Sequence, residues 1–586
     1  MNPWADGLSA LTGHAWAVCA VFVVIVWGFF IIRGILLRFF NSSLTEADVI
    51  SISLAGWVVP ILFLSIFTFG IALLFNAFIA GILAVLIIIV SSLILIRTNA
   101  IRFSILIFVI LLIPSFILRF AFISNLVLPS YFDPAEHYRL IYLLTESYRT
   151  GTFAVELMQA FYHLGFHSAI AFISFYLQIE IIDLMLVFGP LVLALLPFPF
   201  YFLIKRETGS AAAAFFACLL AGFGFHMPAH LMNWGKYPAL LGFVAMLFVF
   251  QLMYMLYRKF ENRKQLIILL SFAVLASGLI HSRTLIVFGL MCLAALITLA
   301  WTHQKILFRR VSFVSLIIAF VIEIVALQNN PALQTLLSSY INNDSLILFF
   351  ILLLSVASAF AYPRQTFFLF AWLILSILCL FIPIPIPIHG IQTPLDRPFV
   401  QMFAIIPFSL LGGLGLAGVT QWMERLRPNC GLIQRFLYFF VFGVVLLNSA
   451  LHYRFYPSEC CRFASRDDLA AFTWMDENLP PDATILIAST GLYVTSFETP
   501  EKQTGVDAGI WIAPLLSRTV KLAGSEIQFD QADTHTDLCK QEVQYIYIGG
   551  MPQSFDAGQL DGIPAWYAPT FALPSAKIYQ VLCKGQ

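Results

Sequence analysis

Charged side chains are scarce in this chain: Asp, Glu, Lys and Arg make up 11% of its 586 residues, whereas hydrophobic residues make up 60%. Soluble domains carry about 25% charged residues. Because so few charges cannot cover a surface that faces water, their scarcity excludes an ordinary soluble protein and predicts an integral membrane protein. The formal net charge of +1 gives no electrostatic basis for binding nucleic acid.

Several catalytic motifs are also missing. The chain contains no His-Glu-x-x-His and no Gly-x-Ser-x-Gly motif, and its basic loops contain no Gly-rich phosphate loop. These absences argue against a nucleotide site and a nucleophilic-serine hydrolase. The first apolar stretch, near residues 15–40, is too long for a signal peptide and has no basic segment before it. We therefore expect no cleavable signal peptide.

Long apolar runs fill the first 453 residues. A helix needs about 20 apolar residues to cross the bilayer core, and fourteen segments approach that length. The stretch 161–177 is instead expected to lie along the outer interface or to dip partly into it. The fourteen spans are expected near residues 15–37, 50–72, 76–96, 103–124, 181–204, 210–226, 237–257, 265–281, 284–302, 311–327, 345–361, 365–382, 398–420 and 434–453.

Lys and Arg residues predict the orientation of these spans. If the N-terminus lies outside, 17 of the 23 basic residues in 1–453 fall at cytoplasmic ends, as the positive-inside rule requires. An even number of spans then places the C-terminus outside as well. We therefore predict a multi-pass protein of the cell (inner or plasma) membrane with both termini extracytoplasmic and the lipid bilayer as its main partner.

Acidic residues mark a boundary near the last span. Residues 454–586 hold 16 of the 31 acids, and residues 1–453 hold the other 15. The shift predicts a transmembrane domain, 1–453, followed by a small extracytoplasmic α/β domain, 454–586. Asp467 and Asp468 are expected to cap a helix that ends near Asn478. Strands are expected at Thr484–Ala488, Gln544–Ile548 and Lys577–Leu582.

Four of the nine cysteines lie in this soluble domain. An oxidising compartment would allow two disulfides. Because the adjacent Cys460 and Cys461 are not expected to pair with each other, each is expected to pair with one of Cys539 and Cys583.

The first large outer loop, 125–180, gathers acidic residues. Asp133 precedes Pro134, which favours the first turn of a helix, and Glu136 follows three residues after Asp133. The structural interpretation is an ordinary capping box. The functional interpretation makes Asp133 a general base for an acceptor hydroxyl, assisted or oriented by Glu136 or His137. The residues alone leave both interpretations open.

Basic residues at the outer ends of different spans suggest an anion site. Alone, each would be a membrane anchor; together, they would suit a lipid-linked phosphate at headgroup depth. The cations are Lys236, Arg283 and Arg397, and the polar residues expected beside them are His230, His281 and Asp396.

Histidines recur with i, i+4 spacing, at His163 with His167 and at His226 with His230. This spacing places two rings on one helical face. The favoured interpretation is that these histidines lie at the membrane interface with their hydrogen bonds made. The sequence requires no cofactor, but a divalent cation remains possible. The nearby aromatic residues, Trp234 and Tyr237, suit an interfacial belt or sugar stacking.

Taken together, these features resemble the GT-C superfamily of polytopic glycosyltransferases, which use polyprenyl-phosphate-linked sugars. The resemblance rests on Asp133 in Phe-Asp-Pro-Ala-Glu-His-Tyr, on Tyr162-His-Leu-Gly-Phe-His167, on Lys205-Arg206-Glu-Thr-Gly209 after an apolar span, and on the tail helix from Asp468. The family often has two adjacent acids or Asp-x-Asp in this loop. Here Asp133 and Glu136 stand three apart, so the choice of base stays open.

The resemblance implies transfer of a sugar (hexosyl or pentosyl) to an extracytoplasmic acceptor glycan, lipid or protein. Asp133 would be the base, and Lys236, Arg283 or Arg397 would hold the donor phosphate. The expected substrate-binding residues are His167, His230, Trp234, Tyr237, His281 and Asp396.

Two rival functions are a transporter or flippase for a lipid-linked or amphipathic substrate, and a non-catalytic membrane scaffold. Gly189-Pro190 and Pro197 interrupt one span, as in transporters. However, mid-span charges, which mark transport paths, are few, and Glu323 is the main candidate.

Overall fold

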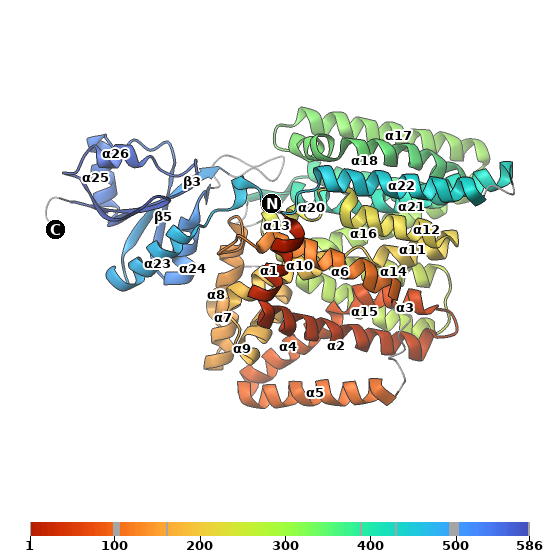
Figure 1. Cartoon of the computed structure of the whole chain (residues 1–586), viewed down its shortest axis with the longest axis horizontal. Helices are drawn as coiled ribbons and strands as arrows, with labels where there is room; N and C mark the ends of the chain where they lie inside the picture. Colours follow the sequence, from red (N-terminus) through yellow and green to blue (C-terminus); the bar gives the residue numbers. More distant parts are fainter. Residues whose placement is uncertain are drawn as a thin grey trace.

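The computed structural model describes residues 2–97, 106–159, 162–386, 390–427, 431–491 and 503–583. Within them, twelve helical segments are long and apolar enough to cross a membrane, and they run side by side in one bundle (Figure 1). They are α2 (Ala15–Phe40), α3 with α4 (Glu46–Gly56, Val58–Leu74), α5 (Ala77–Arg97), α10 with α11 (Ile181–Leu195, Pro199–Thr208), α14 (Tyr237–Tyr257), α15 (Arg263–Ile280), α16 (Arg283–Thr302), α17 (Ile306–Asn329), α18 (Gln334–Ala361), α19 (Pro363–Leu378), α20 with α21 (Arg397–Phe403, Ile405–Leu426) and α22 (Gly431–His452).

These segments coincide with twelve of the fourteen expected spans. The other two contain shorter helices: α6 (Leu106–Phe120) with η1 (Ala121–Ile123), and α12 (Ala211–Leu219) with the π-helical η2 (Leu220–Gly224). Residues 103–105 of the span expected at 103–124 lie outside the described residues. The protein is thus a multi-pass helical membrane protein by the length and composition of its helices.

Short elements gather at one end of the bundle. They include α1 (Pro3–Gly13), α7 (Asp133–Thr150), α8 (Val155–Gln159), α9 (Gly165–Leu177), α13 (His230–Asn233), the 3-10 turn η3 (Cys379–Phe381) and the hairpin β1–β2 (Ile384–Ile386, Gly390–Gln392).

Helix α9 excludes one of the two positions expected for residues 161–177. It does not lie along the surface of the bundle, because its residues from Gly165 to Ser174 are buried and pack against α4 and α7. It also begins only at Gly165, so His163 precedes the helix and shares no helical face with His167.

After α22, the chain forms a six-stranded sheet in the order β4-β3-β6-β8-β7, with β5 also paired to β3. The three strands and the helix predicted in this region are confirmed. The helix cap differs, since Ser465 caps α23 and Asp468 completes the capping box. The elements are η4 (Glu459–Cys461), α23 (Arg466–Asn478), β3 (Thr484–Gly491), β4 (Gln503–Gly505), η5 (Ala508–Trp511), α24 (Ile512–Leu516), β5 (Thr519–Gly524), α25 (Ala532–Lys540), β6 (Tyr545–Gly549), α26 (Ala557–Asp561), β7 (Tyr567–Leu573) and β8 (Ala576–Val581).

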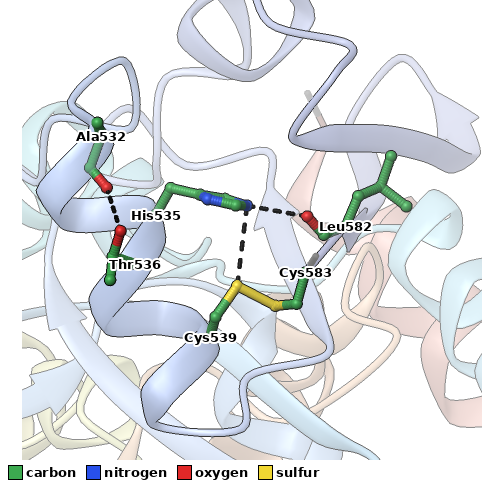
Figure 2. The surroundings of a disulfide bond; sticks show 6 residues. All are labelled: Ala532, His535, Thr536, Cys539, Leu582 and Cys583. Atoms are coloured by element: carbon green, nitrogen blue, oxygen red, sulfur yellow. Dashed lines mark hydrogen bonds between the residues drawn. A yellow bond between two sulfur atoms is a disulfide. The ribbon is translucent and has the colours of Figure 1, made fainter. Parts of the chain in front are cut away.

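The expected disulfide pairing is wrong. Cys539 on α25 bonds to Cys583 just after β8, while Cys460 and Cys461 are free thiols. Figure 2 shows the bond beside His535, whose ring also contacts the carbonyl of Leu582. The pairing follows from the sheet, since α25 packs where the chain leaves β8, whereas η4 lies against the membrane part.

This C-terminal unit contacts the loops at its end of the bundle. The amide of Tyr131 donates to the carbonyl of Cys461 over 2.7 Å, and the ring of Trp511 lies 5.9 Å from that of Tyr138 on α7. The hydroxyl of Tyr456 also reaches Asp6 on α1. The N-terminal helix, the loop region around α7 and the C-terminal unit therefore lie at the same end of the helices.

Candidate functional site

Helix α7 begins at Asp133 itself, with Phe132 in the N-cap position. Of the two interpretations that the sequence leaves open for Asp133, the capping box is therefore excluded. Its carboxylate instead accepts a hydrogen bond from Lys236 Nζ at 2.8 Å. This approach depends on Gly235, which has φ +62°, because a Cβ there would lie 2.1 Å from Pro134 Cγ. A left-handed glycine is the residue that such a turn favours.

A second ion pair faces the first. Arg283, at the start of α16, donates to Asp396 Oδ2 at 2.6 Å. The other oxygen of Asp396 caps α20 by accepting from the amide of Phe399 at 2.9 Å. Asp396 therefore has two structural partners, and it holds the guanidinium of Arg283 in a fixed place.

Four histidines surround these charges. His137 Nδ1 lies 3.1 Å from His167 Nε2, and the ring of His163 lies 4.2 Å from that of His281. Burial lowers the pKa of His137 and of His163 to about 3, and it lowers the pKa of His281 as well, so all three are neutral at pH 7. Within the described residues, His163 Nε2 and His281 Nδ1 are buried without a hydrogen-bond partner.

One small cavity of about 50 Å³ joins these groups. It has room for only a few water molecules, since about 10–15 Å³ of such space is enough for one. Burial lowers the pKa of Lys236, but the nearby Asp133 and Asp396 carboxylates outweigh that effect and raise it overall. The polar lining consists of Asp133, His137, Tyr162, Lys236, His281, Arg283 and Asp396, and the apolar lining of Leu231, Pro238, Ala239, Pro398, Phe399 and Met402.

Six of the residues expected from the sequence therefore meet around one cavity: Asp133, His137, Lys236, His281, Arg283 and Asp396. Glu136 lies on the exposed side of α7, where it forms two hydrogen bonds with Arg139, at 2.7 and 2.8 Å. Arg397 turns toward Thr335 and the carbonyl of Ala332. These two charged residues lie apart from the lining.

The remaining expected residues stand behind or beside the cavity. His167 supports His137 from α9, and Tyr237 is buried against Phe166. His230 stacks edge-on against Trp234 at 4.8 Å, and both lie near the linker to the C-terminal unit. They are placed to support the loop of Lys236.

Tyr162 lines the cavity but was not expected as a site residue. Burial raises the pKa of its phenol, and the Asp133 carboxylate adds to that effect, so Tyr162 remains a neutral hydrogen-bond donor. The sequence feature that could have identified Tyr162 is its position at the start of the Tyr162–His167 motif.

Among the described residues, no group of three or more His, Cys, Asp or Glu side chains is arranged to hold a metal ion.

No known protein family matches the chain, and no curated protein matches it. The chemistry of the site is therefore inferred from its own residues.

Proposed function

We propose that the protein transfers a sugar from a polyprenyl-phosphate-linked donor to an extracytoplasmic acceptor glycan, lipid or protein. One observation carries the proposal: a carboxylate, two cations and neutral hydrogen-bonding rings converge on one cavity at the end of an apolar bundle. A lipid-linked sugar phosphate has the same division into an apolar tail, an anion and hydroxyl groups. The bilayer would hold the tail, and the cavity would hold the polar head.

The proposed reaction is a single displacement. Asp133 takes the proton from the acceptor hydroxyl, whose oxygen forms a bond to the anomeric carbon. The bond from that carbon to the phosphate oxygen breaks, and its electron pair leaves with the polyprenyl phosphate. Lys236 and Arg283 stabilise the leaving phosphate. The anomeric centre is inverted.

The two ion pairs would make the reaction depend on donor binding. In this structure the Asp133 carboxylate is occupied by the Lys236 ammonium 2.8 Å away. The cavity of about 50 Å³ is too small for a sugar, so donor entry requires Lys236 and Arg283 to exchange carboxylate for phosphate. Asp133 then becomes free to accept a proton. Acceptor activation would thus depend on a bound donor.

The unpartnered histidine nitrogens support the sugar part of the proposal. Buried polar atoms without a partner are costly in a folded protein. Within the described residues, His281 Nδ1 is such an atom on a residue that lines the cavity, and His163 Nε2 is another, on the ring next to His281. A sugar hydroxyl would satisfy His281 Nδ1.

The test is sugar transfer by the full-length protein in lipid vesicles. Polyprenyl-phosphate hexoses and pentoses with radiolabelled sugars serve as donors, and a delipidated cell-envelope fraction serves as acceptor. Asp133→Asn is expected to reduce the transfer rate by about 10²–10⁴-fold, the usual contribution of a general base. Glu136→Gln on the same helix is the matched control and should retain the wild-type rate. Equal rates for Asp133→Asn and wild type would overturn the assignment.

Transport is the second candidate, and one observation favours it. Glu323 is 9% exposed inside α17, and its Oε2 has no hydrogen-bond partner among the described residues. Such an intramembrane acid often marks a transport path. However, α17 lies at the edge of the bundle with few buried residues, away from the charged cavity. Movement of a fluorescent lipid-linked sugar across the vesicles, abolished by Glu323→Gln, would favour transport.

A further inference from the structure

A second and larger cavity, of about 280 Å³, lies among α11, α14, α16, α19 and α21. It is lined mainly by apolar side chains, including Phe250, Met291, Phe368 and Leu414. Ligand pockets in proteins usually measure about 300–1,000 Å³, so this cavity has nearly the size that a small ligand or one lipid chain requires.

This cavity begins near the middle of the helices and extends away from the charged one. Helix α16 begins at Arg283 in the charged cavity and lines the second cavity from Met291, eight residues and about 12 Å further along, to Leu299. Helix α14 follows Lys236 and lines the second cavity from Phe250 onward, fourteen residues and about 21 Å further along. The two cavities are therefore separate sites.

The walls indicate how a ligand enters. On one side, Leu296 and Leu299 are 63% and 45% exposed, whereas Leu369 on the opposite wall is 2% exposed. In a membrane-spanning bundle, an exposed leucine in mid-helix faces acyl chains. The opening is consequently toward lipid, which favours a ligand that is itself dissolved in the bilayer.

The polar end of the cavity carries an excess of positive charge. Glu207 accepts hydrogen bonds from Tyr254, at 2.7 Å, and from Gln365, and Arg258 lies 4.0 Å away. The charge of Glu207 is thus already balanced. Arg364 lies 4.8 Å above the ring of Tyr257. In the part of the chain that the structure describes, no carboxylate forms an ion pair with Arg364.

We infer that this cavity binds one anionic phospholipid from the leaflet opposite the charged cavity. One acyl chain fills the apolar part between α16 and α19, and the lipid phosphate accepts hydrogen bonds from the guanidinium of Arg364. Stacking on Tyr257 orients the planar guanidinium, which can donate two parallel hydrogen bonds to a phosphate. Neither group belongs to the proposed transfer site.

The test is lipid binding by the full-length protein in a neutral detergent. Native mass spectrometry would compare phosphatidylglycerol with phosphatidylcholine of the same chains. Wild type is expected to retain one phosphatidylglycerol with at least tenfold preference, because phosphatidylglycerol brings a net negative charge next to Arg364, whereas the choline ammonium of phosphatidylcholine cancels the charge of its phosphate. Arg364→Gln should remove the preference. Arg310→Gln, at an exposed position on α17 near the same end, is the control and should keep it.

A second variant tests the cavity itself. Ala295→Trp at the lipid-facing entrance should reduce retention of both lipids while leaving the thermal unfolding midpoint near that of wild type. Inorganic phosphate should not compete, because it lacks the chain. The inference is overturned if wild type retains both lipids equally, if Arg364→Gln keeps the preference, or if Ala295→Trp leaves lipid retention unchanged.

Discussion

The Arg283–Asp396 pair predicts an asymmetric effect on stability. Asp396 is 8% exposed in its side chain and Arg283 is 27% exposed. Arg283→Met leaves a buried carboxylate without its cation, whereas Asp396→Asn leaves a cation that is partly in contact with water. Because an uncompensated charge costs more when it is more deeply buried, Arg283→Met should be the more destabilising substitution.

Magnitudes follow from the contacts. Breaking a buried pair by removing one partner costs about 3–5 kcal/mol, and we expect Arg283→Met near the lower end of this range, since Lys236 still attracts Asp396. Asn at position 396 retains an oxygen that can accept from the amide of Phe399, so Asp396→Asn should cost about 1–2 kcal/mol. Asp396→Ala also loses the helix cap and should cost about 1 kcal/mol more.

The assay is unfolding of the purified protein by SDS titration in mixed micelles, followed by tryptophan fluorescence. The double variant Arg283→Met with Asp396→Asn removes both charges and should be more stable than Arg283→Met alone. This coupling in a double-mutant cycle isolates the pair from the separate losses. Additive effects, or a larger loss for Asp396→Asn than for Arg283→Met, would refute the reasoning.

Two further predictions concern acid and thiol chemistry. Burial lowers the pKa of His137 and His281, so the unfolded state binds their protons first as the pH falls. The free energy of unfolding is therefore unaffected by these histidines above pH 6.5 and falls below it, by up to about 1.4 kcal/mol per pH unit for each histidine. His137→Gln should make the free energy of unfolding depend less on pH between pH 6.5 and 4. His303→Gln, at an exposed position, is the control and should not. The hydrogen bond from Cys461 lowers the pKa of the exposed Cys460 thiol to about 7. A membrane-impermeant maleimide should therefore label Cys460 on intact cells, and labelling that requires permeabilised cells would contradict an extracytoplasmic C-terminal unit.

The membrane-spanning helices could be predicted from the sequence because the bilayer imposes one simple condition. A segment of about 20 apolar residues must satisfy its backbone internally, and twelve expected spans meet that condition in the structure. The short α12 and the buried α9 were harder to interpret, since neither length nor hydropathy distinguishes a helix buried in protein from one that faces lipid. The disulfide of Cys539 with Cys583 depended on strand order, which cysteine spacing does not encode.

The cavity could be predicted in part. Lys236, Arg283 and Asp396 stand at ends of different spans that the sequence predicts to lie on the same side, and such sidedness alone places residues in one plane. It does not determine which of them point inward. Arg397 follows Asp396 directly, yet its guanidinium turns to Thr335, because the first turn of α20 directs neighbouring side chains to different faces. Glu136, one turn after Asp133, is likewise directed outward by Arg139.

The choice between Asp133 and Glu136 illustrates why three-dimensional context decides a role that spacing leaves open. The same Asp-x-x-Glu pattern fits a capping box, but α7 begins at Asp133, so the carboxylate cannot serve as the cap and is available to Lys236. The contact exists because Gly235 lets the loop before α14 approach Pro134. Gly235→Ala would separate the two loops without removing a charge. If the Lys236–Asp133 pair depends on the close contact of the two loops, this variant would lose it. If the pair depends only on the flexible side chains, it would persist.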